Sequence, residues 1–255
     1  MTSERQTSTD NNRQRRAPAR CAMLLAAGRG TRLGEITQRT PKPLLEVAGS
    51  PLIEHQLRAL AAAGVQRVVI NLHHLGDQLR QHLDGRDWFG LELIISEEPE
   101  LLDTGGGIVQ ALPWLGDDPF IVLNGDIWSD YPLRRLSGSL GDDQLGHLVL
   151  TRRPPSRTEG DFELAIHPGS DRAGPLRGQV RRKGHRPYVQ CGISLLRPEL
   201  FEGRSAEPFS LRELWFQAAA DNKLSGEVWA GSWIDIGTPD QLALARQLAL
   251  HSRAP

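Results

Sequence analysis

The sequence predicts an α/β fold in which helices cover both faces of a mostly parallel β-sheet. Strand-like and helix-like segments alternate along the first half of the chain, an order typical of strands joined by crossover helices. Run 67–72 is rich in β-branched residues and run 120–123 is fully apolar, as expected of strands buried on both faces. With 255 residues, of which 39% are hydrophobic, the chain is long enough to bury a substantial core.

Each element of the first half is indicated by its local pattern. The apolar run from Cys21 to Ala27 predicts the first strand. Ser50-Pro51 predicts a helix with serine as N-cap and proline at its first position, ending at Gly64. The later segments are strand 67–72, helix 75–83, strand 91–95, a helix from Gly105-Gly106-Gly107 to about Leu115, and strand 120–123.

The second half is richer in strands. Residues 147–151 predict a strand, 162–166 and 176–182 predict a hairpin across a turn at 168–175, and 188–196 predicts a central strand. A helix follows at 211–220. Thr238-Pro239 predicts the start of a C-terminal helix that ends near Leu250, and residues 252–255 predict a frayed end.

Residues 1–20 are polar and predict a disordered tail ahead of a single domain over 21–255. A secretory signal is the alternative, since Arg15-Arg16 precedes the short apolar run 22–27. Cleavage after that run would remove the first strand, which disfavours the alternative.

Composition excludes several classes of partner. The net charge of −1 gives no bulk electrostatic case for binding nucleic acid or a membrane surface, and no stretch approaches the ~20 apolar residues of a membrane helix. Cys21 and Cys191 are too few for a disulfide framework and lie in apolar runs, which fits a reducing compartment. We therefore expect a cytoplasmic protein that acts on small molecules.

The most informative segment is the loop after the first strand. Gly28 and Gly30 would let backbone N–H groups close around an anion, and Arg29 and Arg32 carry planar guanidinium groups that fit phosphate oxygens. Lys42 stands between two prolines, which stiffen the backbone that carries it. These features predict a polyphosphate site; a tight turn with surface arginines is the alternative.

Two common nucleotide-binding patterns do not match this loop. Leu33 stands where the dinucleotide fingerprint requires a third glycine or an alanine, which disfavours a nicotinamide-dependent dehydrogenase. The Gly-Lys-Ser/Thr ending of the Walker pattern is also missing.

Residues 24–32, Leu-Leu-Ala-Ala-Gly-Arg-Gly-Thr-Arg, and 40–44, Thr-Pro-Lys-Pro-Leu, together resemble the signature of the sugar-1-phosphate nucleotidylyltransferases. The resemblance implies a Rossmann-like, GT-A-related fold with a mixed, mostly parallel sheet. It also implies a nucleotide half over about 21–130 and a sugar half over about 131–250. One departure is Glu35-Ile36-Thr37, which replaces the family's Pro-Leu-Thr and predicts a less rigid or differently placed loop.

Two aspartates lie at or after short apolar runs, Asp126 in Asn124-Gly125-Asp126 and Asp235 in 233–238. Taken alone, Asp126 fits an ordinary turn and Asp235 fits a cap of the next helix. Ligands of open α/β sheets bind beyond the carboxyl ends of strands, however, and two carboxylates with waters and phosphate oxygens commonly hold Mg²⁺. The resemblance implies that Asp126 and Asp235 bind Mg²⁺ as the cofactor and that Asn124 faces the sugar.

The glycine-rich segment 101–107 would let the backbone approach a base or a ribose; a flexible helix start without a ligand is the alternative. The resemblance implies that the nucleotide is bound by residues of this segment and of the first loop, namely Ala26, Ala27, Gly28, Gly30, Lys42, Gly105 and Gly106. Segments 101–108 and 124–128 resemble most closely the N-acetylmuramate 1-phosphate uridylyltransferases of peptidoglycan recycling.

The sugar site is the least clearly marked. Gly160-Asp161-Phe162 and Gln190-Cys191-Gly192-Ile193 lie where the related enzymes contact the sugar, and the resemblance implies that Gly160, Cys191 and Gly192 join Asn124 in binding it. The basic run Arg181-Arg182-Lys183 is interpreted as a solvated strand end. The alternative is a contact between one of these cations and the lactyl carboxylate of a muramyl sugar.

The resemblance implies transfer of a nucleoside monophosphate from a nucleoside triphosphate, with UTP favoured, to a sugar 1-phosphate, with N-acetylmuramate α-1-phosphate favoured, and release of pyrophosphate. Such a reaction depends on positioning and on charge neutralisation. Arg32 would hold the leaving pyrophosphate, Lys42 would neutralise charge at the transferred phosphate, and Asp126 would act through the metal.

Alternatives of substrate and of class stay open. The chain could be a guanylyl-, thymidylyl- or cytidylyltransferase that uses another sugar 1-phosphate or phosphocholine. A non-catalytic nucleotide-sensing subunit is disfavoured because it need not keep Arg32, Lys42, Asp126 and Asp235. The sequence shows no long C-terminal extension of the kind found in many relatives, which favours a monomer or a simple homodimer.

Overall fold

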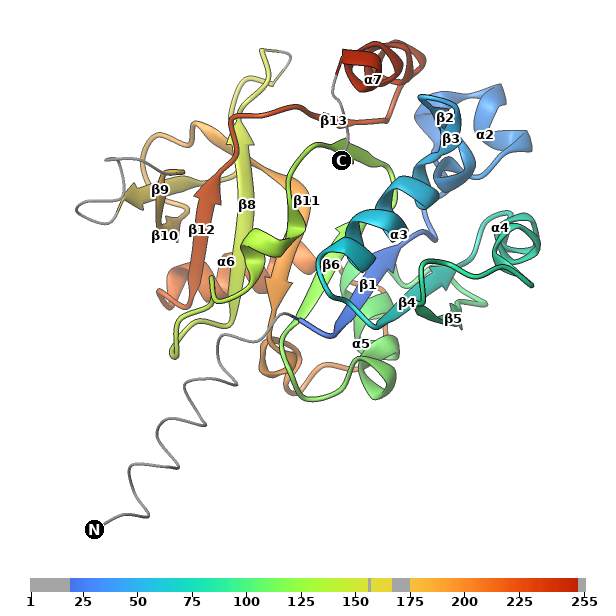
Figure 1. Cartoon of the computed structure of the whole chain (residues 1–255). Coiled ribbons are helices and arrows are strands. Elements are labelled where there is room, and N and C mark those ends of the chain that lie inside the picture. Colours follow the sequence, from blue (N-terminus) through green and yellow to red (C-terminus); the bar gives the residue numbers. More distant parts are fainter. Residues whose placement is uncertain (1–18, 156, 167–174, 252–255) are drawn as a thin grey trace.

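The structure is a computed structural model that describes residues 19–155, 157–166 and 175–251. Its centre is a nine-stranded sheet. In spatial order the strands are β5 (Glu92–Glu97), β4 (Arg67–Leu72), β1 (Cys21–Leu25), β6 (Phe120–Asn124), β11 (Tyr188–Leu196), β8 (Gly146–Arg152), β12 (Leu224–Val228), β10 (Arg177–Arg181) and β9 (Glu163–Ile166) (Figure 1).

Most strands of the sheet run in the same direction, and a minority run in the opposite direction. β5, β4, β1 and β6 pair in parallel, and β12 is parallel to β8. β11 is antiparallel to both β6 and β8, and β10 is antiparallel to β12 and β9. The predicted mixed, mostly parallel sheet is therefore confirmed, and strands from both halves of the chain belong to it.

Apolar side chains of β1 alternate between the two faces of the sheet. Ala22 and Leu24 join a core cluster with residues of α3 (Leu52–Ala62) and α4 (Gly76–Leu83), whereas Met23 joins a second cluster with residues of α5 (Asp103–Leu115) and α6 (Leu211–Ala220). Figure 1 shows α3 in front of the sheet and α5 and α6 behind it. The predicted helices on both faces are confirmed.

A third core cluster joins the loop after β1 to the C-terminal helix α7 (Pro239–His251). Leu242 and Ala245 of α7 pack there with Leu33, Val47 and Trp128. The short elements of this region are η1 (Thr31–Leu33), α2 (Glu35–Arg39), η2 (Lys42–Leu44), β2 (Glu46–Val47), β3 (Ser50–Pro51), β7 (Ile127–Ser129) and β13 (Trp233–Asp235). Two more short helices, η3 (Leu133–Leu136) and η4 (Pro198–Phe201), lie in the second half of the chain. β7 pairs with β13 and β2 with β3, so the cluster supports the loops that carry the predicted phosphate and metal residues.

Several boundaries differ from the predicted ones for identifiable reasons. Ser50 is not the N-cap of α3. Ser50 and Pro51 form β3, and the Leu52 N–H donates to the Leu45 carbonyl at 3.0 Å. A backbone pairing therefore satisfies the group that a serine cap would have served. The cap predicted at the last helix is confirmed, since Thr238 Oγ1 accepts from the N–H of Gln241 at 3.3 Å.

One central strand, β12, was missed by the sequence analysis. Its middle residues are Ser225, Gly226 and Glu227, which break the apolar pattern of a buried strand. Glu227 is nevertheless 0% exposed, because the Tyr131 hydroxyl and the Arg177 guanidinium donate to its carboxylate at 2.6 and 2.7 Å. Pairing by charged and hydroxyl groups from other elements is what permits a carboxylate at this position.

Some predicted segments fall beyond the described residues. The predicted tail 1–20 is described only at residues 19 and 20, the predicted turn 168–175 only at residue 175, and the predicted frayed end 252–255 not at all. Within the described ranges, no helix combines the length and the apolar character needed to cross a membrane.

Candidate active site

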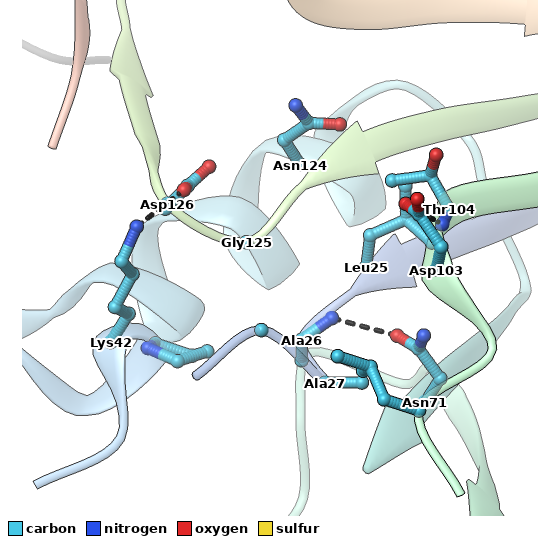
Figure 2. Close-up of a pocket in the computed structure, with 13 residues that line it drawn as sticks. Leu25, Ala26, Ala27, Lys42, Asn71, Asp103, Thr104, Asn124, Gly125 and Asp126 are labelled. Atoms are coloured by element: carbon cyan, nitrogen blue, oxygen red, sulfur yellow. Dashed lines mark hydrogen bonds and ion pairs between the residues drawn. The ribbon is translucent and has the colours of Figure 1, made fainter. Parts of the chain in front are cut away.

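A cavity of about 280 Å³ opens beyond the carboxyl ends of β1, β4 and β6 (Figure 2). This is the edge at which open α/β sheets bind their ligands. The residues around it come from five separate segments of the chain: Leu25, Ala26, Ala27, Gly28, Lys42, Pro43, Asn71, Leu101, Asp103, Thr104, Asn124, Gly125 and Asp126. The structure therefore brings together most of the residues that the sequence assigned to the nucleotide and to the metal.

The loop after β1 is wrapped tightly around Lys42. Gly30 has a φ of +66°, and a Cβ atom there would lie 2.8 Å from both Lys42 Cε and Thr37 Cγ2. The Thr37 hydroxyl donates to the Gly30 carbonyl at 2.9 Å. Thr37 belongs to α2, the short helix formed by the segment that departs from the family pattern at Glu35. Glycine is thus required at residue 30 by the backbone and by the space that Lys42 occupies.

Lys42 pairs directly with Asp126. Its ammonium group donates to Asp126 Oδ2 at 2.8 Å, and the Lys42 side chain is only 10% exposed (Figure 2). Gly125 lets the turn approach β1, because its N–H donates to the Leu25 carbonyl at 2.8 Å and a Cβ atom would lie 2.6 Å from that oxygen. The turn that carries Asp126 is therefore positioned against the first strand.

Gln56, on the inner face of α3, holds both sides of the same turn. Its amide nitrogen donates to the carbonyl of Asn124 at 2.8 Å and to that of Ile127 at 3.2 Å. Gln56 is 7% exposed. A polar side chain on an otherwise apolar helix face was the sequence signal for this role, and the sequence analysis did not use it.

Asp235 reaches the site through the β7–β13 pair. Asp235 is the register partner of Ile127, and the N–H of Ile236 donates to the carbonyl of Asp126 at 2.8 Å. Burial raises the pKa of the Asp235 carboxyl above its ordinary value, and the nearby Asp126 carboxylate raises it further. Arg32, largely exposed, lies 4.0 Å from Asp235 Oδ2. All four residues predicted to carry the chemistry thus converge.

The two aspartates fit a divalent cation. Within the described ranges, no group of three or more His, Cys, Asp or Glu side chains could hold a metal ion. Mg²⁺ does not require such a group, because it is commonly held by one or two carboxylates together with waters and substrate phosphates. The mutual repulsion that raises the pKa of Asp235 is the interaction that a shared cation would relieve. Mg²⁺ as the cofactor stays a prediction.

Two glycines of α5 pack closely against the segment that precedes α6. A Cβ atom on Gly105 would overlap the ring of Phe209, and one on Gly106 would overlap the Glu207 carbonyl. These glycines therefore permit a close approach of Phe209 and Glu207, and their contact with a base or a ribose stays a prediction. From the glycine-rich segment, Leu101, Asp103 and Thr104 line the cavity.

The residues predicted to bind the sugar are only partly near a cavity. Cys191 is 0% exposed, its thiol donates to the Val149 carbonyl at 3.1 Å, and burial raises its pKa. The Cys191 side chain therefore points into the core, so a contact between Cys191 and the sugar would involve its backbone, and that contact stays a prediction. A Cβ atom on Gly160 would overlap the Arg186 carbonyl, so this glycine too packs against the chain.

Gly192 packs closely against the side chain of Asn124. It has a φ of +76°, and a Cβ atom there would lie 3.0 Å from Asn124 Cβ. Asn124 itself lines the cavity. Gln190, a sequence neighbour, lines a second cavity that shares Asn124 with the first.

Asn71 and Glu98 were missed by the sequence analysis. Asn71 lines the cavity, accepts a hydrogen bond from the Ala26 N–H at 2.7 Å and donates to Glu98 Oε1 at 2.7 Å. Glu98 Oε2 accepts from the Leu102 N–H at 3.0 Å. This pair ties the first loop to the start of α5. The signal was a polar residue inside the apolar run 67–72, the same kind of signal that identified Asp235.

The chain is similar to known nucleotidyl transferases. A family model described as nucleotidyl transferase matches residues 21–252. The chain is 39% identical to an N-acetylmuramate α-1-phosphate uridylyltransferase of Neisseria meningitidis serogroup B, over 89% of this chain and 97% of that protein. It is 36% identical to one of Caulobacter vibrioides, over 89% of this chain and 96% of that protein.

More distant similarities widen the comparison. A mannose-1-phosphate guanylyltransferase catalytic subunit of Drosophila pseudoobscura is 31% identical, over 91% of this chain and 62% of that protein. Among solved structures, a UDP-glucose pyrophosphorylase in complex with UDP-glucose superposes with a TM-score of 0.76 at 16% identity, covering 92% of this chain and 99% of that one. This last similarity shows the Rossmann-like fold.

Proposed function

Because this chain belongs to the nucleotidyl transferase family, we propose that it transfers a uridylyl group from UTP to N-acetylmuramate α-1-phosphate and releases pyrophosphate. The coarser statement, that it is a sugar-1-phosphate nucleotidyltransferase, follows from the family and from the relatives. The specific substrate pair is supported by two uridylyltransferases that match nearly their whole length at 36% and 39% identity.

The observation that carries the reaction is the convergence of Lys42, Asp126, Asp235 and Arg32 beside one cavity. These residues come from three distant parts of the sequence. Cations that neutralise phosphate charge, beside carboxylates that can hold a divalent metal, are groups that phosphoryl transfer uses. A turn would account for Asp126 alone, and a helix cap would account for Asp235 alone. Neither interpretation explains why the two carboxylates lie close together.

The residues of the chain would divide the work as follows. Backbone groups at Ala26, Ala27 and Gly28, at the end of β1, would orient the nucleotide in the cavity. Lys42 would stabilise the negative charge that grows on the transferred phosphate, and Arg32 would bind the leaving pyrophosphate. The acceptor needs no protein base, because a sugar phosphate is already an anion. A Mg²⁺ ion held by Asp126 and Asp235 would supply further charge neutralisation.

A pyrophosphate-release screen tests the proposal. Each of UTP, GTP, dTTP and CTP is combined with N-acetylmuramate α-1-phosphate, N-acetylglucosamine 1-phosphate, mannose 1-phosphate or phosphocholine, in the presence of Mg²⁺. We expect the highest kcat/KM with UTP and N-acetylmuramate α-1-phosphate. A higher kcat/KM with GTP and mannose 1-phosphate would assign the chain to the activity named for its 31%-identical relative.

A non-catalytic nucleotide sensor is the candidate from another class. Such a protein would bind a nucleoside triphosphate, as seen by calorimetry, yet release no pyrophosphate with any acceptor. The Lys42–Asp126 pair argues against it, because a partly buried ion pair costs some desolvation and a sensor has no need of it.

A further inference from the structure

A second cavity of about 230 Å³ adjoins the first. The two share the wall formed by Leu25, Asp103, Thr104 and Asn124. The far walls come from the loop before β9, from β11 and from the first turns of α6, and their residues are Arg157, Asp161, Phe162, Gln190, Ser210, Leu211, Arg212 and Trp215. A ligand that crosses Asn124 therefore reaches both cavities.

Two guanidinium groups in this cavity are held by one carboxylate. Arg157 donates from both terminal nitrogens to Asp161, at 3.1 and 3.3 Å, and Arg212 donates to Asp161 Oδ1 at 2.8 Å. The Asp161 side chain is 10% exposed, whereas those of Arg157 and Arg212 are 43% and 51% exposed. The buried carboxylate orients the pair, and the cations keep exposed N–H donors.

The charge on this wall is not balanced by Asp161 alone. Asp161 contributes one negative charge against the two positive charges of its partners, which leaves the far wall cationic. Asp103 is a further carboxylate of the cavity, but it lies on the wall shared with the first cavity and accepts the N–H of Thr104. Trp215 adds a buried indole N–H that has no partner among the described residues.

Resting on the proposed function, we propose that Arg157 and Arg212 bind a carboxylate group on the acceptor sugar. A guanidinium group presents paired N–H donors that match the two oxygens of a carboxylate. The cations suited to the phosphates belong elsewhere: Lys42 lines the first cavity and not the second. A sugar whose 1-phosphate lies beside Lys42 and whose ring passes Asn124 directs its far substituents toward the arginine pair.

The proposal assigns carboxylate binding to Arg157 and Arg212 and not to the basic run Arg181-Arg182-Lys183. Arg182 lies exposed, with its guanidinium carbon 3.8 Å from the centre of the Phe216 ring. Arg212 lies 5.4 Å from the centre of the same ring. Of these two cations on one aromatic ring, Arg212 lines the cavity, so Arg182 provides a matched control.

The test compares two acceptors that differ by the carboxylate. N-Acetylmuramate α-1-phosphate carries a lactyl ether, and N-acetylglucosamine 1-phosphate is the same sugar without it. For Arg212→Met we expect the KM for the first to rise about ten- to a hundredfold, the range for losing a hydrogen bond to an ionised group. The KM for the second, or its inhibition constant where turnover is slow, should stay unchanged. Arg182→Met should change neither value.

Each other outcome has a defined meaning. An equal loss with both acceptors would show that the pair binds the 1-phosphate, and no loss with either would show that it binds neither group; both results overturn the proposal. Arg212→Lys and Arg157→Met provide second variants if Arg212→Met unfolds, as judged by thermal unfolding. A wild-type enzyme that rejects N-acetylmuramate α-1-phosphate with every nucleotide would refute the proposed function before any variant is tested.

Discussion

The contact between Gly30 and Lys42 gives a quantitative test of how the first loop controls the site. Gly30→Ala would introduce a Cβ atom 2.8 Å from Lys42 Cε and 2.8 Å from Thr37 Cγ2, on a residue with a φ of +66°. Lys42 cannot move away freely, because its ammonium group is 2.8 Å from Asp126. We therefore expect the substitution to disturb both stability and catalysis.

The size of the effect follows from these contacts. A non-glycine residue in the left-handed region costs about 1–2 kcal/mol, and overpacking of a filled site costs about 1–3 kcal/mol more. Gly85 has a similar φ of +68°, but a Cβ atom there would meet nothing within 4 Å. The difference in unfolding free energy between Gly30→Ala and Gly85→Ala should therefore be about 1–3 kcal/mol. The effect of alanine on the unfolded chain is common to both variants and cancels.

Catalysis should respond more sharply than stability. A displacement of about 1 Å in a positioning group can reduce the rate about a hundredfold, and Lys42 must shift to admit the new methyl group. We expect kcat/KM for pyrophosphate release to fall about ten- to a hundredfold in Gly30→Ala and to stay at the wild-type value in Gly85→Ala. Wild-type kcat/KM in a folded Gly30→Ala protein, or equal losses in both variants, would refute the reasoning.

Lys42→Met removes the cation that pairs with Asp126, and we expect kcat to fall ~10²–10³-fold; pyrophosphate release at the wild-type rate would contradict the role given to Lys42. His147 should make stability pH-dependent, because burial lowers its pKa from 6.5 to about 4. The stabilisation from its neutral form is complete above pH 6.5 and is lost as the pH falls toward 4, so denaturant unfolding should show a loss of about 3 kcal/mol that is missing in His147→Asn. Equal pH slopes in the two proteins would exclude His147 as the source. Gln56→Leu removes the amide that holds the turn carrying Asp126, and we expect more Mg²⁺ to be needed for half-maximal rate; a superimposable Mg²⁺ titration would show that the turn holds its shape without this amide.

The elements that the sequence predicted well are those formed by local pattern. β4, β11 and α6 have the predicted bounds, because β-branched runs and helical spacing are set within one segment. β12 was missed because its buried carboxylate, Glu227, is stabilised by Tyr131 and Arg177 from elsewhere in the chain. No local pattern reveals such partners.

The candidate site shows the same division. Lys42 and Asp126 were assigned through the resemblance of their segments to a family signature, and the structure places their side chains 2.8 Å apart. Gly105 was assigned from a sound principle, that glycine permits close approach, but the sequence does not state what approaches, and here it is Phe209. The partners of a residue depend on long-range packing, which one segment does not encode.

The pairing of β7 with β13 also sets an order of events during protein synthesis. It brings together Asp126 and Asp235, which are more than a hundred residues apart in the chain. At about 5–20 residues per second on the ribosome, the second carboxylate is made on the order of ten seconds after the first. During that interval the nascent chain already contains β1, β4 and β6, yet it lacks half of the proposed metal pair. On the proposed role of this pair, we expect a polypeptide that ends before β13 to transfer no nucleotidyl group, and activity to begin only after β13 has paired with β7.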